Sequence, residues 1–140
     1  PGPELAALEG VHALTDVTGF GLAGHALELA RGAKLDVVID WSRVPVLEGV
    51  RKLASEGFVT GASGRNWAGY GKSMVLPAGF AEVDQALLSD PQTSGGLLVS
   101  CTPGEADRVI EIFRSHGFAQ AAVIGECAGA GAGAPRVVVR

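Results

Sequence analysis

The sequence is poor in several residue types, and each scarcity excludes a class of protein. Its two cysteines, Cys101 and Cys127, are isolated and stand at no zinc-binding spacing from the histidines. We therefore expect free thiols rather than a disulfide framework or a zinc site. No apolar run approaches the length of a membrane span, and no signal-peptide pattern is present. We expect a cytoplasmic protein that does not enter a membrane.

Positive charge is also scarce. Eleven Lys and Arg residues against fifteen Asp and Glu residues give a net charge of -4, and the basic residues form no cluster. Nucleic acid is therefore not expected as a direct partner. Apolar residues make up 47% and charged residues 19% of the 140 positions. This balance is typical of one globular domain with a real core.

Methionine occurs once, as Met74, and the chain starts at Pro1. Both facts favour a piece of a longer protein. In that interpretation residues 1–10 are a linker or a cloning remnant, and residues 11–140 form a single domain.

Hydrophobic periodicity and turn residues predict interleaved helices and strands, with the last two strands antiparallel. This order favours a mixed sheet covered by helices. A Gly/Ala stretch from Ala128 to Ala134 is predicted to form a mobile hairpin tip between those strands. We expect helices over 20–31, 45–57, 82–88 and 102–117, strands over 11–17, 35–40, 96–101, 121–125 and 136–139, and an ordered glycine-rich loop over 57–79.

Residues 14–25 carry the densest set of candidate site residues. Glycines such as Gly19 and Gly21 let a backbone approach a ligand closely, and a helix beginning here would direct N–H groups and partial positive charge at an anion. Asp16 could hold a hard cation. The stretch thus predicts a phosphate or metal-phosphate corner. Asp16 or Thr18 could equally be a capping residue, because caps use the same residue types.

Two nucleotide-binding motifs are matched only in part. Gly19–Gly24 has the spacing G-x-G-x-x-G, and Asp40 closes the next predicted strand at the distance of a ribose-binding acid. Two threonines and an aspartate precede the fingerprint, however, where a buried parallel strand should be apolar. Residues 66–73 resemble half of a P-loop, but Asn66 stands where its first glycine is required.

Two further positions carry open alternatives. His25 lies off the apolar stripe of its predicted helix, and we expect it to be exposed or at an interface. Gly95 and Gly96 allow a close backbone approach, either to a neighbouring segment or to a ligand.

Three segments in this order and spacing resemble those of selenophosphate synthetases (selenide, water dikinases): Thr15–Gly21, Gly64–Asn66 and Asp90–Leu98. Their wider superfamily also contains aminoimidazole ribonucleotide synthetase. The resemblance covers about Val11 to Arg140 and corresponds to the C-terminal domain of that enzyme. It implies an α+β fold, a three-layer α/β/α sandwich with a mixed β-sheet.

The resemblance also implies an activity in selenium metabolism and selenocysteine biosynthesis. Selenide, ATP and water give selenophosphate, AMP and phosphate, with Mg²⁺ as cofactor. Asp16 matches the aspartate that this domain contributes to the Mg²⁺–ATP site, and Thr18, Gly19 and Gly21 would support the phosphate side. The catalytic residues are expected in an N-terminal domain that these residues lack. The implied partners are that domain, a second copy in a homodimer and a selenium-delivery protein. The chain alone should be inactive.

Two rival functions stay open from the sequence. The chain could be a non-catalytic domain that covers a site and recruits selenium-pathway partners through residues 60–71. It could also bind a nicotinamide dinucleotide through Gly19–Gly24.

Overall fold

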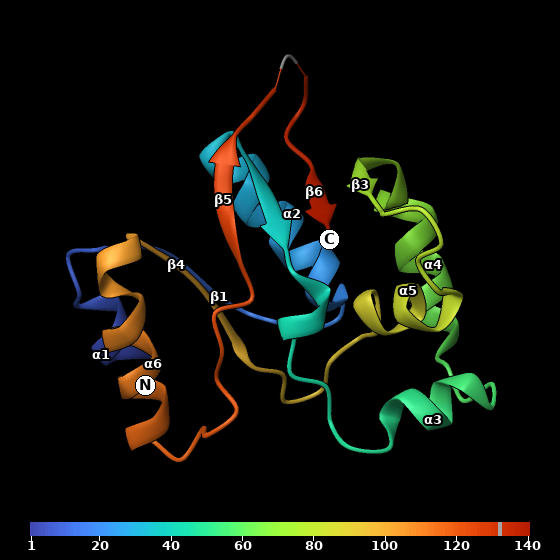
Figure 1. The fold of residues 1–140 in the computed structure, drawn as a ribbon, viewed down its shortest axis with the longest axis horizontal. Coiled ribbons are helices and arrows are strands. Elements are labelled where there is room, and N and C mark those ends of the chain that lie inside the picture. The colour runs from blue at the N-terminus through green and yellow to red at the C-terminus, as the bar shows by residue number, and fades with distance from the viewer. Residues whose placement is uncertain (132) are drawn as a thin grey trace.

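The computed structural model describes residues 1–131 and 133–140. Helices α1 and α6 lie on one side of the molecule beside strands β1 and β4, whereas α3, α4 and α5 lie on the other side (Figure 1). The elements, in order, are α1 (Gly2–Ala6), β1 (Val11–Asp16), α2 (Gly21–Ala33), β2 (Leu35–Ile39), the 3₁₀ turn η1 (Trp41–Arg43), α3 (Val50–Ser55), α4 (Gly61–Tyr70), the 3₁₀ turn η2 (Gly71–Ser73), β3 (Met74–Val75), α5 (Glu82–Leu88), β4 (Leu97–Cys101), the 3₁₀ turn η3 (Pro103–Glu105), α6 (Ala106–Ser115), β5 (Gly125–Gly129) and β6 (Val137–Val139).

The strands form two sheets. The larger has the order β3-β6-β2-β5, in which β2 pairs parallel with β6 and antiparallel with β5. The smaller joins β1 and β4 antiparallel, with Asp16 opposite Leu97. The predicted α+β fold with a mixed sheet is confirmed.

Strands β5 and β6 run in opposite directions, as predicted, but β2 lies between them. Residues 128–134 therefore do not form the predicted hairpin, because the strands that they join, β5 and β6, do not pair with each other. Ala128 and Gly129 belong to β5, and Ala132 lies outside the described residues.

Two apolar clusters hold the sheets and helices together. The larger packs α2 onto the larger sheet through small side chains, which allow close approach of helix and sheet. Its buried members are Ala23, Ala26, Leu27, Ile39, Leu88, Val137 and Val139. The smaller cluster lies under β1 and β4 and consists of Leu5, Val109 and Ile112. Residues 1–10 thus contribute to the core, because Leu5 on α1 is fully buried.

The predicted helix over 45–57 is wrong in extent. Helix α3 spans only Val50–Ser55, and Leu47, expected on its buried face, is 70% exposed. Gly49 has a φ of +80°, a left-handed conformation that stops a helix from extending through it.

The predicted loop over 57–79 is also wrong, because its centre forms helix α4. Glycine disfavours a helix by about 1 kcal/mol relative to alanine, and three glycines in this segment suggested a loop. Two other features outweigh them. The Thr60 side chain accepts a hydrogen bond from the Ser63 N–H at the helix start, and Trp67 and Tyr70 pack against the larger cluster.

Two element boundaries differ from the prediction. Gly125, expected as the last residue of a strand, instead begins β5, and a Cβ there would overlap the Val38 carbonyl. Helix α2 continues past Gly32, and Lys34 takes the left-handed conformation (φ 56°) that ends it. Among the described residues, no helix has both the length and the apolar character to cross a bilayer.

Helix α2 should depend on Leu27, which is 2% exposed in the larger cluster. We expect Leu27→Ala to lower the free energy of unfolding by about 2–5 kcal/mol, because it leaves a cavity. The matched substitution Leu47→Ala, at a residue 70% exposed, should cost less than about 1 kcal/mol. Urea unfolding followed by circular dichroism measures both; equal losses would contradict this assignment of the core.

Candidate functional site

The candidate site is the turn between β1 and α2. Strand β1 ends at Asp16, and α2 begins at Gly21. Asp16, Thr18 and Gly19 are exposed. The residue that precedes the helix is Phe20, which makes no side-chain capping hydrogen bond. The alternative that Asp16 or Thr18 caps this helix is therefore wrong; the Thr18 hydroxyl instead lies 3.1 Å from His25 Nε2.

Gly21 packs this turn against the loop after α5. Its φ of +68° suits glycine, and a Cβ there would meet the Ser89 carbonyl carbon at 2.7 Å and the Asp90 oxygen at 2.9 Å. The glycine expected to face a phosphate thus has a close protein neighbour.

The segment 90–96 pairs with the other side of the turn. The Val17 N–H donates to the Gly96 carbonyl and the Gln92 N–H to the Thr18 carbonyl, both at 2.9 Å. A Cβ on Gly95 would overlap the Val17 oxygen. Of the two alternatives for the glycine pair, close approach to a neighbouring segment is the one that the structure supports.

Helix α4 supplies the third segment. Asn66 Nδ2 donates to the Gly19 carbonyl at 2.8 Å and to the Ser89 carbonyl at 3.1 Å. Four residues later, the Tyr70 hydroxyl donates to the Phe20 carbonyl at 2.6 Å. The three segments that carry the family resemblance therefore meet at this one turn.

Asp90 joins the start of α4 to the segment 90–96. Its Oδ1 accepts hydrogen bonds from the hydroxyls of Thr60 at 3.2 Å and Ser63 at 3.0 Å. Ser63 is buried, so the carboxylate keeps a buried hydroxyl hydrogen-bonded, as buried polar groups require. Asp90 thus has a structural role that its sequence motif did not reveal.

His25 contradicts the sequence-based expectation. It is 6% exposed rather than at the surface. Its Nε2 lies 3.1 Å from Thr18 Oγ1 and its Nδ1 lies 2.9 Å from Glu28 Oε2. These polar contacts explain how His25 can be buried although it lies off the apolar stripe of α2. The i+3 spacing of Glu28 was the only sequence feature that could have indicated them.

Within the described residues, no group of three or more His, Cys, Asp or Glu side chains is placed to hold a metal ion. Asp16 is an exposed carboxylate without such neighbours. This donor set fits one ligand of a Mg²⁺ ion, which takes few carboxylates along with phosphates and water. It does not make a complete metal site.

The dinucleotide alternative is contradicted by the topology. Strand β1 pairs antiparallel with β4, and β2 belongs to the other sheet. A dinucleotide fingerprint requires both strands in one parallel sheet. Asp40 Oδ1 instead accepts a hydrogen bond from Ser42 Oγ at 2.7 Å.

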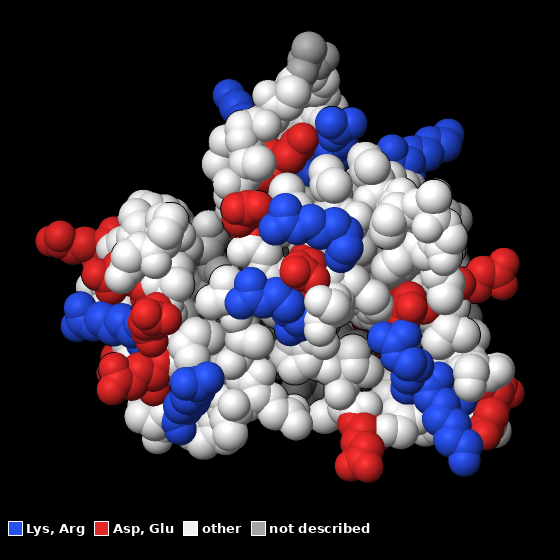
Figure 2. Space-filling view, viewed as in Figure 1, with Lys and Arg blue, Asp and Glu red and all other residues white. Residues whose placement is uncertain are grey.

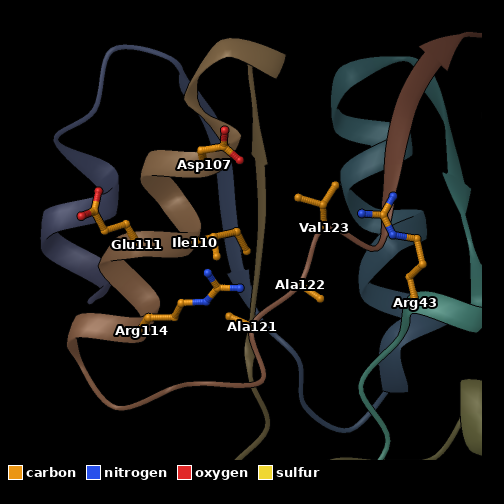
Figure 3. A pocket seen from close by; sticks show the side chains of 8 residues that line it. All are labelled: Arg43, Asp107, Ile110, Glu111, Arg114, Ala121, Ala122 and Val123. Carbon is orange, nitrogen blue, oxygen red and sulfur yellow. The ribbon is translucent and has the colours of Figure 1, made fainter.

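Acidic and basic side chains are interspersed over the visible face (Figure 2). A cavity of about 570 Å³ between α6 and the 121–123 segment is lined by charges of both signs, including Arg43, Asp107 and Arg114 (Figure 3). A second, mostly apolar cavity of about 980 Å³ reaches Val17. Neither Asp16 nor Thr18 lines either cavity.

The surroundings of Cys101 disfavour ionisation of its thiol. Burial raises the pKa of the Cys101 thiol, and the nearby Glu105 carboxylate raises it further. A higher pKa means less of the nucleophilic thiolate. Both cysteines are free.

These features define a class of protein. The model of the AIR synthase related protein, C-terminal domain, matches residues 2–138. The chain belongs to this family. Its fold resembles that of E. coli HypE, a hydrogenase maturation protein, with a TM-score of 0.66 and 20% identity, over 98% of this chain and 34% of the HypE chain.

Within the family, the resemblance to selenide, water dikinases is confirmed. The chain is 59% identical over 139 residues to the selenide, water dikinase of Pseudomonas straminea, which covers 99% of this chain and 38% of that protein. It is 61% identical over 128 residues to the selenide, water dikinase of Burkholderia cenocepacia, over 91% of this chain and 36% of that protein. It is 50% identical over 138 residues to the selenide, water dikinase of Rhizobium meliloti, over 99% of this chain and 39% of that protein. The chain thus spans less than half the length of these relatives and matches their C-terminal part.

Tyr70 offers a direct probe of the assembled turn. Burial raises the pKa of Tyr70 to about 12, against the opposing effect of the Gly24 backbone N–H. The folded chain holds this proton more tightly than the unfolded chain does. The resulting stabilisation is complete below about pH 10 and is lost as the pH rises toward 12.

Because Tyr70 is the single tyrosine, tyrosinate absorbance reports it alone. We expect an ionisation midpoint near 12 in the folded chain and near about 10 in urea. Tyr70→Phe should abolish the absorbance change and weaken the alkaline loss of stability. A midpoint near about 10 in the folded chain would contradict the burial of this hydroxyl.

Proposed function

We propose that this chain is the C-terminal domain of an enzyme that converts selenide, ATP and water into selenophosphate, AMP and phosphate. The observation that carries the proposal is the identity of 59% over 139 residues with a selenide, water dikinase. The convergence of three matching segments on one turn supports it, because that arrangement leaves Asp16 exposed beside the start of α2.

Asp16 would supply one carboxylate ligand to Mg²⁺ in the whole enzyme. The other protein ligands and the catalytic groups lie in an N-terminal domain, in line with the share of the relatives that this chain spans. Bound there, Mg²⁺ would neutralise phosphate charge and orient the phosphoryl groups. Gly19 and Gly21 shape the turn, and the first N–H groups of α2 add partial positive charge. The whole enzyme acts as a homodimer in the cytoplasm.

A chimera tests this proposal. The chain replaces the matching part of the Pseudomonas straminea protein, and selenide-dependent AMP formation is measured. We expect activity within about tenfold of the parent, because 59% identity preserves the domain interface. The isolated chain should show none. A folded chimera without activity would overturn the proposal.

Asp16 is then tested within the active chimera. Asp16→Asn keeps the shape of the side chain but removes the charge, and it should lower the rate by at least about 100-fold, since loss of about 2.7 kcal/mol of transition-state stabilisation suffices for that. Asp107→Asn, the same change at an exposed carboxylate on α6, is the control and should have little effect. Near-normal turnover of Asp16→Asn at ordinary Mg²⁺ would refute the metal role.

Helix α4 supports the alternative in which residues 60–71 cover the proposed site. Asn66 and Tyr70 on this helix hold the carbonyls of Gly19 and Phe20, so α4 stabilises the turn that bears Asp16. Recruitment of a selenium-delivery protein through the exposed side of the same helix stays a prediction.

A further inference from the structure

The arrangement of Thr18, His25 and Glu28 fixes the direction of one hydrogen bond at the candidate site. His25 Nδ1 lies 2.9 Å from Glu28 Oε2. An ionised carboxylate only accepts hydrogen bonds, so the Nδ1 atom must carry a proton. Glu28 therefore selects the tautomer of the histidine.

The other ring nitrogen faces Thr18. Nε2 lies 3.1 Å from Thr18 Oγ1, and the ring is buried at one edge of α2 with the Phe20 ring 6.0 Å away. In a neutral ring with its proton on Nδ1, Nε2 has only a lone pair. The Thr18 hydroxyl must then donate its single proton in this contact, because an unprotonated Nε2 can only accept.

We propose, on the basis of the proposed function, that Thr18 presents only acceptor lone pairs to the site and so binds the hydration water of the cation held by Asp16. Its single proton is committed to His25. Thr18 cannot then donate to a phosphate oxygen. Mg²⁺ keeps several waters in most protein sites, and such waters need acceptors. His25 and Glu28 are positioning residues that act through Thr18.

The opposite tautomer of His25 would reverse the direction of the hydrogen bond to Thr18. With the proton on Nε2, His25 would donate to Thr18, and the hydroxyl proton would be free to bind a phosphate oxygen. Loss of the hydroxyl would then weaken ATP binding rather than metal binding. The two arrangements predict different protonation of the His25 ring nitrogens and different effects of removing the Thr18 hydroxyl.

The first experiment reads the tautomer in this chain. Nitrogen-15 NMR of the labelled imidazoles at about pH 8, where an ordinary histidine is neutral, distinguishes a protonated from an unprotonated ring nitrogen. His25→Gln identifies the His25 signals among those of the three histidines. We expect a protonated Nδ1 and an unprotonated Nε2 for His25. Glu28→Ala should shift the ring toward the other tautomer, and Glu56→Ala, at another exposed glutamate, should not. A protonated Nε2 in the unaltered chain would overturn the proposal.

The second experiment uses the active chimera. Thr18→Val removes the hydroxyl at nearly constant shape and should raise the Mg²⁺ concentration for half-maximal rate by about tenfold, the usual cost of losing a group that orients a metal's ligands. KM for ATP should change less than about twofold, since uniform ATP binding is retained. Thr18→Ser, which restores the hydroxyl, should recover most of the metal affinity.

Two outcomes separate this inference from the proposed function. If Thr18→Val raises KM for ATP and leaves the Mg²⁺ dependence unchanged, the inference is wrong although the chimera and Asp16 behave as proposed. If Asp16→Asn is fully active, the metal role itself fails. Thermal unfolding of each variant confirms that the exposed Thr18 position tolerates the change.

Discussion

The structure depends on hydrogen bonds to three consecutive backbone carbonyls in the turn after β1. The carbonyls of Thr18, Gly19 and Phe20 accept hydrogen bonds from Gln92 N, Asn66 Nδ2 and the Tyr70 hydroxyl. These donors come from two segments distant in the chain. Because all three carbonyls accept hydrogen bonds from other parts of the chain, the turn is fixed in one conformation. Asp16 and the Thr18 hydroxyl are thereby placed at its exposed side.

Steric contacts reinforce this arrangement where hydrogen bonds alone would not suffice. Gly21 and Gly95 each bring backbone against backbone at distances that no side chain would permit. Their substitution would push apart the segments that carry the donors. Gly21, which suggested a ligand-facing loop in the sequence, therefore has a packing role within the protein, whereas a Cβ on Gly19 would meet no atom within 4 Å.

In the proposed function, this domain contributes one part of a site. It offers one carboxylate, one oriented hydroxyl and the start of α2, but within the described residues it holds no cluster of metal ligands. The phosphoryl transfer of the proposed function relies on positioning and electrostatics, which a rigid turn favours. The buried His25, hydrogen-bonded on both ring nitrogens, adds to the rigidity of the turn.

The sequence by itself determined the elements whose pattern is local: strand 35–40, helix 82–88, the helix that follows Pro103, and the family resemblance with Asp16 as its metal candidate. The tertiary structure alone decided the rest. Helix α4 forms despite its glycines because Trp67, Asn66 and Tyr70 find partners far away in the chain. His25 is buried for a different reason: its partners Thr18 and Glu28 are near in the chain, but the Thr18 contact forms only when the turn folds back on α2, a constraint that no periodicity in the sequence records.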